Sequence, residues 1–417
     1  MGKLTHHFSE TRHNFYENIP DYWADLYGQE YSLFDIREVT EEERRQKHTF
    51  AYRCGQIFFK AGALLRSEQV KDEWLEEIGY PKETIAFLRL HTMRNATIIG
   101  RFDSVEVNGV EKLLEFNSDT PTFIKELFHV NGKVCEEFGY DNPNEGAELQ
   151  LQAILQDAIT SECRKVNKNE MPYLVFTSHA QHVEDRYTLH YLQELSGIPS
   201  KYVPLEQLTI IRGKGLFDGD GEKIDVLYRQ TSPIESLVVD EDPDTGEPIG
   251  QYLLELVVKN KLRIINPPSA FLLQNKALMA IIWSLHEERS PFFTEEEHTW
   301  INLHFLATYF QADPFLENRM KYVKKPVFGR EGDTVEIYDE DGELAMQDPH
   351  KSYTQYVSIY QQYVDLPKVA FQSEKGVQEG HLMTGTFLLS GRPSAFGFRV
   401  GNQITDNLSY YLPCGIR

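Results

Sequence analysis

The sequence predicts an α+β (mixed α/β) fold, because its first part alternates helices with strands and its last part consists of antiparallel hairpins. Residues 21–94 are expected to be mostly helical, because they contain the run EEERRQKHTFAYRCGQIFFKAGALL, whose apolar residues recur at helical spacing and which holds few helix breakers. From residue 322 onward the chain changes to short strands separated by turns, namely VKKPVF, TVEIYD, MTGTFLLSG and SAFGFRV. Both halves therefore contribute strands, and the first contributes most of the helices.

The elements between these two ends follow from local spacing and from turn residues. Helical spacing predicts helices over residues 123–138, 147–166, 182–195 and 271–286, the last one preceded by Pro267-Pro268. Short buried strands are expected at 172–177, 201–203 and 224–228. Two polar, glycine-rich segments, 213–222 and 239–250, are expected to be solvated loops.

The composition excludes some classes of partner. The chain has 417 residues and is 41 % hydrophobic, so it can bury a substantial core. Its 64 acidic residues exceed its 42 basic ones, which gives a formal net charge of −22. Such a surface repels nucleic acid and anionic membranes, since both require clusters of Lys and Arg. An anionic small molecule is still allowed, because it requires only local positive charge.

The cysteines and the N-terminal segment indicate a cytoplasmic protein. The four cysteines, Cys54, Cys135, Cys163 and Cys414, are scattered and form no CxxC pair, which suits a reducing compartment. The segment MGKLTHHFSETRHNF has no apolar stretch that could act as a signal peptide. No apolar run is long enough to span a bilayer. We therefore expect a soluble, cytoplasmic protein without membrane contact.

A predicted hairpin over residues 101–122, RFDSVEVNGVEKLLEFNSDTPT, carries an unusual set of polar side chains. Arg101 and Asp103 lie on its first arm, and Glu115, Asn117 and Asp119 share one face of its second arm, because strand residues alternate between faces. Carboxylate and amide oxygens are the ligands that Mg²⁺ prefers. The alternative is an ordinary hairpin with one solvated polar face.

The register of this hairpin decides whether the two arms present their polar residues together. A two-residue Asn108-Gly109 loop would place Asp103 opposite Leu114 and turn Glu115 to the other face. One extra residue, in a longer loop or a bulge between Val105 and Lys112, would place Asp103 opposite Glu115. Since bulges often occur beside active sites, we predict an odd loop or a bulge in that interval.

Three cations in apolar surroundings, together with an arginine in a glycine-rich loop, form a second set of candidates. Lys325 alternates with valines in YVKKPVFGREG, and the glycine-rich end of that segment carries Arg330. Lys276 lies in QNKALMAIIW and Arg399 in SAFGFRV. A buried cation requires an anionic partner, and a guanidinium suits a phosphate, although a lysine more commonly extends to the surface. Each of these features is weak evidence by itself. Together with the carboxylates of the hairpin, the cations favour an ATP-dependent enzyme.

Familiar nucleotide and hydrolase motifs do not occur. The sequence has no Walker loop, no GxGxxG that follows a strand, and no GxSxG elbow. The segment DGDGEK is similar to a calcium loop but has Lys223 where glycine is required and Arg229 where glutamate is required.

Five blocks in a fixed order identify a family resemblance. The blocks RFD…LLEFNSDTPT, NKALMAIIWSL, YVKKPVFGREG, IYQQ and GTFLLSG…GFRV resemble the synthetase portion of the glutathionylspermidine synthase family, a branch of the ATP-grasp ligases. The resemblance covers most of the chain, so we expect a single catalytic unit over residues 1–417, whose subdomain boundaries the sequence does not resolve. It implies an ATP-grasp fold, in which two α+β units hold ATP between them.

The resemblance also implies a role for each matching residue. It implies that Mg²⁺, as two ions, is bound by Asp103, Glu115 and Asn117. It implies contacts to ATP from Lys276 and Lys325, a loop closing above it at Gly329 and Gly332, and a hinge beside adenine at Gln361, Gln362, Tyr363 and Val364. It implies that the reacting phosphate or carboxylate is contacted by Arg101, and that the acyl-phosphate and its transition state are stabilised by Arg330 and Arg399. It implies substrate contacts from Thr120, Thr122, Glu184 and Asp185.

The implied reaction is the formation of an amide bond. ATP phosphorylates the carboxylate of a peptide-like acid, and an amine or polyamine attacks the acyl-phosphate, which yields ADP and phosphate. Glu184 or Asp185 could attract the amine or accept its proton. The alternatives are an ATP-binding ATP-grasp protein without catalysis and a phosphotransferase that uses the same nucleotide site.

Two departures from the family pattern limit the expectation. The chain carries no signature of the N-terminal cysteine amidase domain found in two-function members, so we expect no hydrolysis of the product. The segment TSPIESL, after Tyr228-Arg229, departs from the expected substrate-binding stretch. The sequence therefore leaves open whether the substrates are glutathione and spermidine. It also does not reveal the pathway or the oligomeric state.

Overall fold

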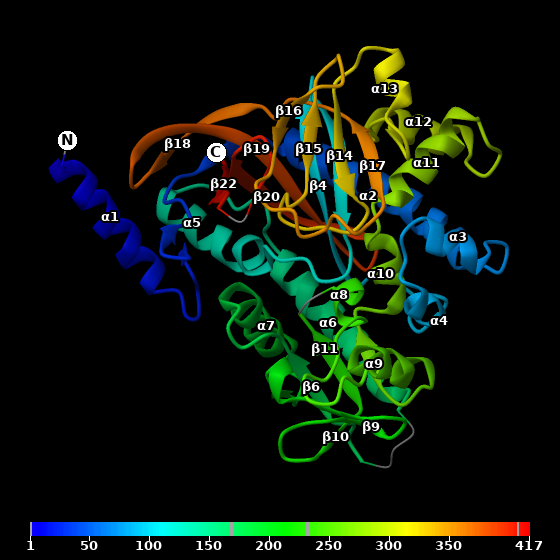
Figure 1. The fold of residues 1–417 in the computed structure, drawn as a ribbon. Coiled ribbons are helices and arrows are strands. Elements are labelled where there is room, and N and C mark those ends of the chain that lie inside the picture. Colours follow the sequence, from blue (N-terminus) through cyan, green and yellow to red (C-terminus); the bar gives the residue numbers. More distant parts are fainter. Residues whose placement is uncertain (1, 167–169, 231–232, 407) are drawn as a thin grey trace.

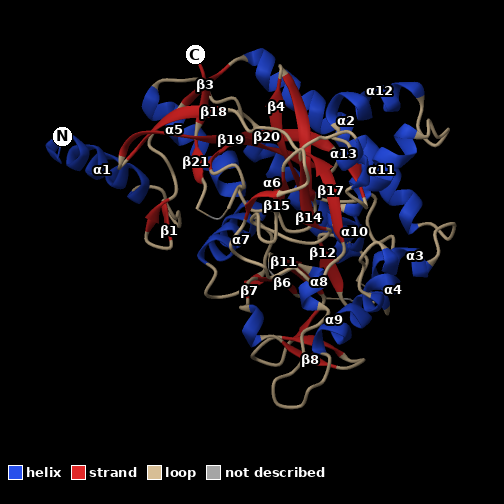
Figure 2. Cartoon of the chain, turned by 45° about the horizontal axis from the view of Figure 1, so that its top comes forward, coloured by secondary structure: helices blue, strands red, loops and turns tan. Residues whose placement is uncertain are grey.

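Two antiparallel sheets and one parallel sheet form the framework of the structure, a computed structural model that describes residues 2–166, 170–230, 233–406 and 408–417 (Figure 1). The helices surround these sheets, as Figure 2 shows. The predicted mixture of helices and strands is confirmed, including the antiparallel strands late in the chain. Among the described residues, no helix combines the length and the apolar character that a bilayer span requires.

The largest sheet contains the predicted hairpin at one edge. Its strand order is β21-β20-β19-β4-β5, and β18 also pairs with β19. These strands are β4 (Ile99–Val107), β5 (Val110–Asn117), β18 (Lys368–Ser373), β19 (Gly376–Leu389), β20 (Arg392–Gly401) and β21 (Tyr410–Leu412). Strands far apart in the sequence are therefore neighbours, since β19 pairs with β4.

The hairpin register has the predicted outcome but a different position for the bulge. A two-residue Asn108-Gly109 loop connects the strands, so the expectation of an irregularity between Val105 and Lys112 is wrong. The bulge lies further along, at Leu114, where the register shifts between Asp103 and Ser104. Asp103 consequently faces Glu115, and Arg101 faces Asn117. The left-handed conformations of Asn108 (φ 52°) and Gly109 (φ 80°) are those of the favoured two-residue turn, which explains why the loop stays short.

A second antiparallel sheet covers the polar end of the hairpin. Its order is β13-β17-β14-β15-β16. Its strands are β13 (Thr308–Tyr309), β14 (Tyr322–Pro326), β15 (Glu336–Tyr338), β16 (Leu344–Gln347) and β17 (Ser358–Gln362). Its central strand, β14, carries Lys325.

A parallel sheet of order β12-β11-β6-β7 forms the centre of the lower part of Figure 1. Its strands are β6 (Leu174–Thr177), β7 (Lys201–Tyr202), β11 (Val226–Arg229) and β12 (Arg263–Ile265). Successive residues belong to different cores, since Val175 packs in one hydrophobic cluster and Phe176 in another. Both faces are therefore buried, as expected of a parallel sheet.

Small antiparallel and parallel pairs complete the strands. They are β1 (Asp25–Leu26) with β2 (Gln29–Glu30), β3 (Arg37–Val39) with β22 (Cys414–Ile416), and the three-stranded sheet of β8 (Thr209–Ile211), β9 (Gly215–Phe217) and β10 (Lys223–Ile224). The β1–β2 pair and the sheet of β8, β9 and β10 differ from the prediction. Residues 21–40 are not helical, and the segment 213–222 contains a strand.

The helices pack mainly on the sheets and on each other. They are α1 (Gly2–Glu17), α2 (Glu41–Arg66), α3 (Asp72–Glu77), α4 (Ile85–Leu88), α5 (Asn131–Phe138), α6 (Ala147–Arg164), α7 (Val183–Ser196), α8 (Ile234–Leu237), α9 (Ile249–Val258), α10 (Pro268–Gln274), α11 (Ala277–Glu287), α12 (Glu295–His304) and α13 (Asp313–Glu317). Three single turns are η1 (Lys82–Thr84), η2 (Glu126–Val130), which is π-helical, and η3 (Leu205–Gln207). The longest helix, α2, begins at a capping box in which Thr40 and Glu43 bond each other's backbone N–H. Because α1 begins at Gly2, the N-terminal segment is helical, which the sequence analysis does not anticipate.

The predicted helix over residues 271–286 is two helices, broken at Asn275 and Lys276. The Asn275 backbone is extended (ψ 121°), and its side-chain Oδ1 accepts the N–H of Ala277 at 2.7 Å. The N–H of Lys276 donates to the carbonyl oxygen of Val327 at 2.9 Å instead of continuing the helix. The break therefore joins the start of α11 to the segment after β14.

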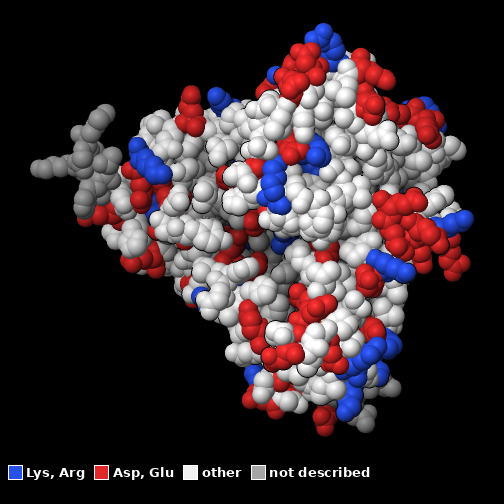
Figure 3. Space-filling model, in the orientation of Figure 1, with Lys and Arg blue, Asp and Glu red and all other residues white. Residues whose placement is uncertain are grey.

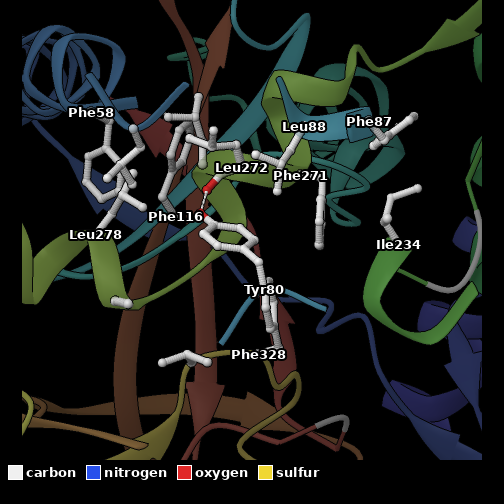
Figure 4. Close-up of a cluster of buried hydrophobic side chains, with 14 of the residues drawn as sticks. Phe58, Tyr80, Phe87, Leu88, Phe116, Ile234, Phe271, Leu272, Leu278 and Phe328 are labelled. Atoms are coloured by element: carbon white, nitrogen blue, oxygen red, sulfur yellow. Dashed lines mark hydrogen bonds between the residues drawn. The ribbon is translucent and has the colours of Figure 1, made fainter. Parts of the chain in front are cut away.

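One cluster of buried aromatic and aliphatic side chains joins several of these elements (Figure 4). Tyr80 lies in its centre, where its hydroxyl donates to the carbonyl oxygen of Leu272 at 2.5 Å. Phe271 and Phe328 stack with their ring centroids 5.3 Å apart, which packs α10 against the segment that follows β14. This packing fixes the position of the strand that carries Lys325.

Candidate active site

One cavity is lined by every predicted site residue except Asp185. Residues from the hairpin, from β14 and its following loop, from β17 and from β20 contribute to its wall. Figure 3 shows a hollow near the centre of the molecule, on a face where acidic side chains are widespread. The structure thus gathers residues that are up to about 300 positions apart, from Arg101 to Arg399.

The predicted metal-binding residues form one hydrogen-bonded group. Asn117 Nδ2 donates to Asp103 Oδ2 at 3.0 Å and to Glu115 Oε1 at 2.9 Å. The Arg101 guanidinium donates to both oxygens of Asp103, at 2.7 Å and 2.9 Å, and to the carbonyl oxygen of Thr122 at 2.7 Å. Gly385, which pairs with Asp103 from β19, leaves room for this arrangement, because a Cβ there would lie 3.2 Å from Arg101 Cδ.

Burial and neighbouring charge act in opposite directions on the two carboxylates. Burial raises the pKa of Asp103, although the Arg101 guanidinium opposes that effect. Burial would also raise the pKa of Glu115, but the ammonium groups of Lys276 and Lys325 lower it to about 2. Glu115 is therefore charged throughout the physiological range, and it offers a permanent negative charge on the cavity wall.

The two lysines meet this carboxylate from different elements. Lys276 Nζ lies 3.2 Å from Glu115 Oε2 and donates to the carbonyl oxygen of Gly329 at 2.8 Å. Lys325 Nζ donates to the carbonyl oxygen of Leu114, the bulge residue, at 3.1 Å. Burial lowers the pKa of Lys325 to about 8, with Glu115 opposing and Lys276 adding to the change. Neither lysine is a surface residue, since both are 8 % exposed.

The loop after β14 closes one side of the cavity. Arg330 Nη2 donates to the carbonyl oxygen of Thr120 at 3.2 Å and to its hydroxyl. Gly332 has a left-handed conformation (φ 75°), and a Cβ there would lie 2.7 Å from the carbonyl oxygen of Thr405. Only glycine therefore lets the loop approach the segment 404–405 this closely.

The predicted hinge segment forms an opposite, more apolar wall. Gln361 is buried in β17, where its Nε2 lies 3.4 Å from Thr308 Oγ1. The segment that follows is fixed by Gln403, which donates to the carbonyl oxygen of Val364 at 3.0 Å and accepts the N–H of Leu366 at 3.1 Å. The apolar side chains of this wall are Val323, Val335, Ile337, Val364, Leu366 and Met383.

The remaining end of the cavity brings a carboxylate and a guanidinium together. It contains Glu184, from the first turn of α7, and Arg399, from β20. Burial, together with the negative charge of Glu126, raises the pKa of Glu184 to about 7. The Arg399 guanidinium lies over the Phe123 ring, 5.5 Å from its centroid.

The family model for the glutathionylspermidine synthase preATP-grasp matches residues 6–417. The chain belongs to this family. The family resemblance stated from the five sequence blocks is therefore confirmed.

Two relatives match nearly the whole chain. A protein of Haemophilus influenzae, provisionally named an acid–amine ligase, is 22 % identical over 95 % of this chain and 93 % of its own length. The trypanothione synthetase of Crithidia fasciculata is 23 % identical over 98 % of this chain. The match spans 62 % of the length of that synthetase.

A solved structure shares the fold. A glutathione synthetase-like effector from Globodera pallida, in its apo form, superposes with a TM-score of 0.53 and 14 % identity. The superposition covers 92 % of this chain and 89 % of the effector. This likeness concerns the fold alone, and it agrees with the ATP-grasp type of α+β fold that the sequence predicts.

The donor set suits a cation that brings other ligands with it. No group of three or more His, Cys, Asp or Glu side chains within the described ranges is arranged to hold a metal by itself. Asp103 and Glu115 provide two carboxylates and Asn117 an amide oxygen, all on the cavity wall. Mg²⁺ commonly uses one or two carboxylates and completes its shell with water and phosphate oxygens. The residues present therefore fit Mg²⁺ with a bound nucleotide.

Two acidic residues named in the sequence analysis lie outside the cavity wall. Asp185 is adjacent to Glu184 but is not part of the lining, and its Oδ2 is 3.7 Å from His182 Nδ1. Asp119 lies beyond the end of β5 and does not share the face of Glu115, since it is buried in an ion pair with Arg229. Residues 231–232, in the segment TSPIESL, lie outside the described residues.

The structure adds residues that the sequence analysis misses. Gln403 fixes the hinge segment, and the buried Glu126 raises the pKa of Glu184, although neither belongs to a motif. A glutamate within the apolar stretch of residues 123–134 was the available signal for Glu126, because a buried carboxylate requires partners.

Proposed function

We propose that the protein is an ATP- and Mg²⁺-dependent carboxylate–amine ligase, which joins a peptide-like acid to an amine or polyamine and releases ADP and phosphate. The observation that carries the proposal is one cavity that holds Lys276 and Lys325 beside Glu115 and a further carboxylate, Glu184, on another part of its wall. A polyphosphate suits the two lysines, and a cationic amine suits Glu184. The family membership and the names of the two relatives support the same class of reaction.

The nucleotide is assigned to the space between the hinge wall and the lysines. The apolar side chains around Gln361, Gln362, Tyr363 and Val364 suit a purine ring. Lys276 and Lys325 then neutralise phosphate oxygens, and the loop at residues 329–332 covers them. In this arrangement Asp103, Glu115 and Asn117 would hold Mg²⁺, which would supply positive charge beside the phosphate oxygens.

The reaction requires positioning more than covalent help from the protein. Arg101, which is held by Asp103, lines the same cavity as Arg330 and Arg399, so their positive charges would stabilise an acyl-phosphate formed there. Thr120 and Thr122 lie on the same wall and suit the acid substrate. Glu184 attracts the ammonium group of the amine and accepts its proton before attack.

The deciding experiment is ADP release by the purified protein with ATP and Mg²⁺, measured against a panel of peptide-like acids and amines, with mass detection of products. The proposal requires ADP release that depends on both substrates and a condensed product. A phosphorylated acceptor without condensation would indicate the phosphotransferase. Nucleotide binding without any product would indicate a protein that binds ATP without catalysis, and no nucleotide binding would exclude all three.

A further inference from the structure

A buried glutamine holds two backbone carbonyl oxygens of the cavity wall. Gln230 directly follows β11, is 2 % exposed and is not part of the cavity lining. Its Nε2 donates to the carbonyl oxygen of Thr120 at 3.2 Å and to that of Pro121 at 3.0 Å, and both of these residues line the cavity. The carbonyl oxygen of Thr120 also accepts from Arg330 Nη2 at 3.2 Å, so both of its lone pairs have a donor. Gln230 therefore directs two carbonyl groups of the wall toward a buried side chain behind it.

The carbonyl oxygens on either side of this pair are held by side chains as well. Asn266 Nδ2 donates to the carbonyl oxygen of Asp119. Arg101 Nη1 donates to the carbonyl oxygen of Thr122 at 2.7 Å. All four carbonyl oxygens of residues 119–122 thus accept a hydrogen bond from a side chain, and a ligand beside this segment meets no unpaired carbonyl oxygen of these residues.

The direction of the Pro121 carbonyl group also sets the direction of the next backbone N–H. The peptide bond between Pro121 and Thr122 is trans and planar, so its C=O and its N–H point in opposite directions. Because this C=O points to Gln230, the N–H of Thr122 points away from Gln230. Within the part of the chain that the structure describes, this N–H has no hydrogen-bond acceptor. It is therefore available to a ligand.

An anionic oxygen is the partner that suits this N–H. Two guanidinium groups that line the same cavity bond the same short segment, Arg101 at Thr122 and Arg330 at Thr120. Backbone N–H groups and cationic side chains together stabilise the negative charge that develops on oxygen in acyl transfer. Because the neighbouring carbonyl oxygens are turned to other donors, a carboxylate or phosphate oxygen would meet little repulsion here.

We propose that the N–H of Thr122 donates to an anionic oxygen of the acid substrate or of its acyl-phosphate, and that Gln230 is the positioning residue that directs this N–H into the cavity. Gln230 touches no substrate itself, because it lies outside the lining. The inference rests on the proposed ligase function, since it names a group that recognises the acid. It gives Gln230, which belongs to no motif, a role in the preference of this wall for an anion.

The peptide bond between Pro121 and Thr122 can be observed alone by NMR. The dipeptide Pro-Thr occurs once in the sequence, so the deuterated full-length protein with carbon-13 in proline carbonyl groups and nitrogen-15 in threonine gives one signal for it. In the unchanged protein without nucleotide, inorganic phosphate is expected to move the proton signal of the Thr122 N–H downfield until it saturates. Sodium chloride at equal ionic strength is expected to leave it in place. No response to phosphate, or an equal response to both salts, would overturn the proposed donor.

Gln230→Met tests the positioning residue, because methionine has a similar length but no N–H donor. In this variant the carbonyl carbon of Pro121 is expected to move upfield, and the affinity for phosphate measured at Thr122 is expected to fall about fivefold, the usual contribution of one hydrogen bond. The matched control is Gln152→Met, which removes a donor at 3.0 Å from the carbonyl oxygen of Leu195, outside the cavity, and should change neither signal. If Gln230→Met fails to fold, Gln230→Asn, which withdraws the amide by one carbon–carbon bond, is expected to give the same two changes.

Steady-state kinetics separates this role from a general loss of stability. With the acid and the amine that the ADP-release panel identifies, Gln230→Met is expected to raise KM for the acid about fivefold and to leave KM for ATP unchanged. An equal change in both KM values, or an unchanged phosphate response at Thr122, would overturn the positioning role of Gln230 even if the protein makes an amide. Absence of ATP-dependent condensation would overturn the ligase function, and the phosphate titration would still decide whether the N–H of Thr122 binds an anion.

Discussion

Lys325 provides the sharpest test of the nucleotide assignment, because its protonation is adjustable near pH 8. Burial lowers its pKa from the ordinary 10.5 to about 8, which means that the surroundings disfavour the charged form by about 3 kcal/mol. A polyphosphate beside the ammonium group restores the charge and must supply that free energy. Because Lys325 is about 90 % charged at pH 7 and about 10 % charged at pH 9, binding of ADP or ATP should be roughly tenfold weaker at pH 9.

Calorimetric titration of nucleotide at several pH values measures this change. Near pH 8.5, binding should also take up a proton, seen as a dependence of the heat on the buffer. The matched control is Lys325→Arg, whose guanidinium stays charged, so its affinity should be nearly constant from pH 7 to 9. Equal pH dependence in both proteins, or none in either, would refute the assignment of Lys325 to the phosphates.

The lowered pKa of Lys325 also predicts how the free energy of unfolding changes with pH in the absence of ligand. The unfolded chain keeps the Lys325 proton up to about pH 10.5, whereas the folded protein releases it at about 8. The unfolded state therefore binds more protons in that window, and this site should increase the free energy of unfolding as pH rises from 8 to 10.5. Denaturant unfolding of the unchanged protein and of Lys325→Arg, compared across that window, checks the sign.

Two further sets of changes test the stability of the fold, and a third tests the metal assignment. Lys47 and Glu111 form a buried ion pair whose side chains are 2 % and 4 % exposed. In denaturant unfolding, Lys47→Met should lower the free energy of unfolding by about 3–5 kcal/mol, because it leaves the Glu111 carboxylate buried without its partner, and adding Glu111→Gln should recover most of that loss. Equal losses in the single and the double variant would contradict this. Gly397→Ala would place a Cβ 2.2 Å from Leu127 Cδ2, so it should lower the free energy of unfolding by about 1–3 kcal/mol. Gly219→Ala, whose Cβ would meet open space, should lower it by less than about 0.5 kcal/mol in the same assay. Glu115→Gln should abolish Mg²⁺-dependent ADP release and leave the circular dichroism spectrum intact; unchanged turnover would contradict the metal assignment.

Periodicity in the sequence was sufficient to predict the helices and strands whose side chains face a core. The helix at α6 and the strand at β6 begin and end close to where apolar spacing places them. Parity arguments also predicted that Asp103 faces Glu115, because side-chain alternation in a strand is nearly invariant. The position of the bulge was not predictable by the same argument, since Leu114 restores the parity as well as a residue nearer the turn does.

Contacts between segments that are distant in the sequence determine the structural features that the sequence did not predict. The break before α11 depends on the bond from Lys276 N–H to the Val327 carbonyl oxygen, about fifty residues away, as well as on the local bond from Ala277 N–H to the Asn275 side chain. Glu126 carries no motif, and its surroundings come from Tyr31 and Tyr411, at opposite ends of the chain. Such features arise from packing, which propensity and spacing do not contain.

Two local irregularities assemble the charged centre of the cavity, and each depends on the other's presence. The bulge at Leu114 turns Glu115 toward the cavity and also presents a carbonyl oxygen to Lys325. The break at Asn275 starts α11 late, so that Lys276 is attached to the segment after β14 and meets Glu115 at 3.2 Å. A regular hairpin would leave two buried ammonium groups without their carboxylate, and a continuous helix would remove one of those ammonium groups. The bulge and the helix break thus bring one carboxylate and two ammonium groups together, and a regular hairpin would leave both ammonium groups buried without that carboxylate.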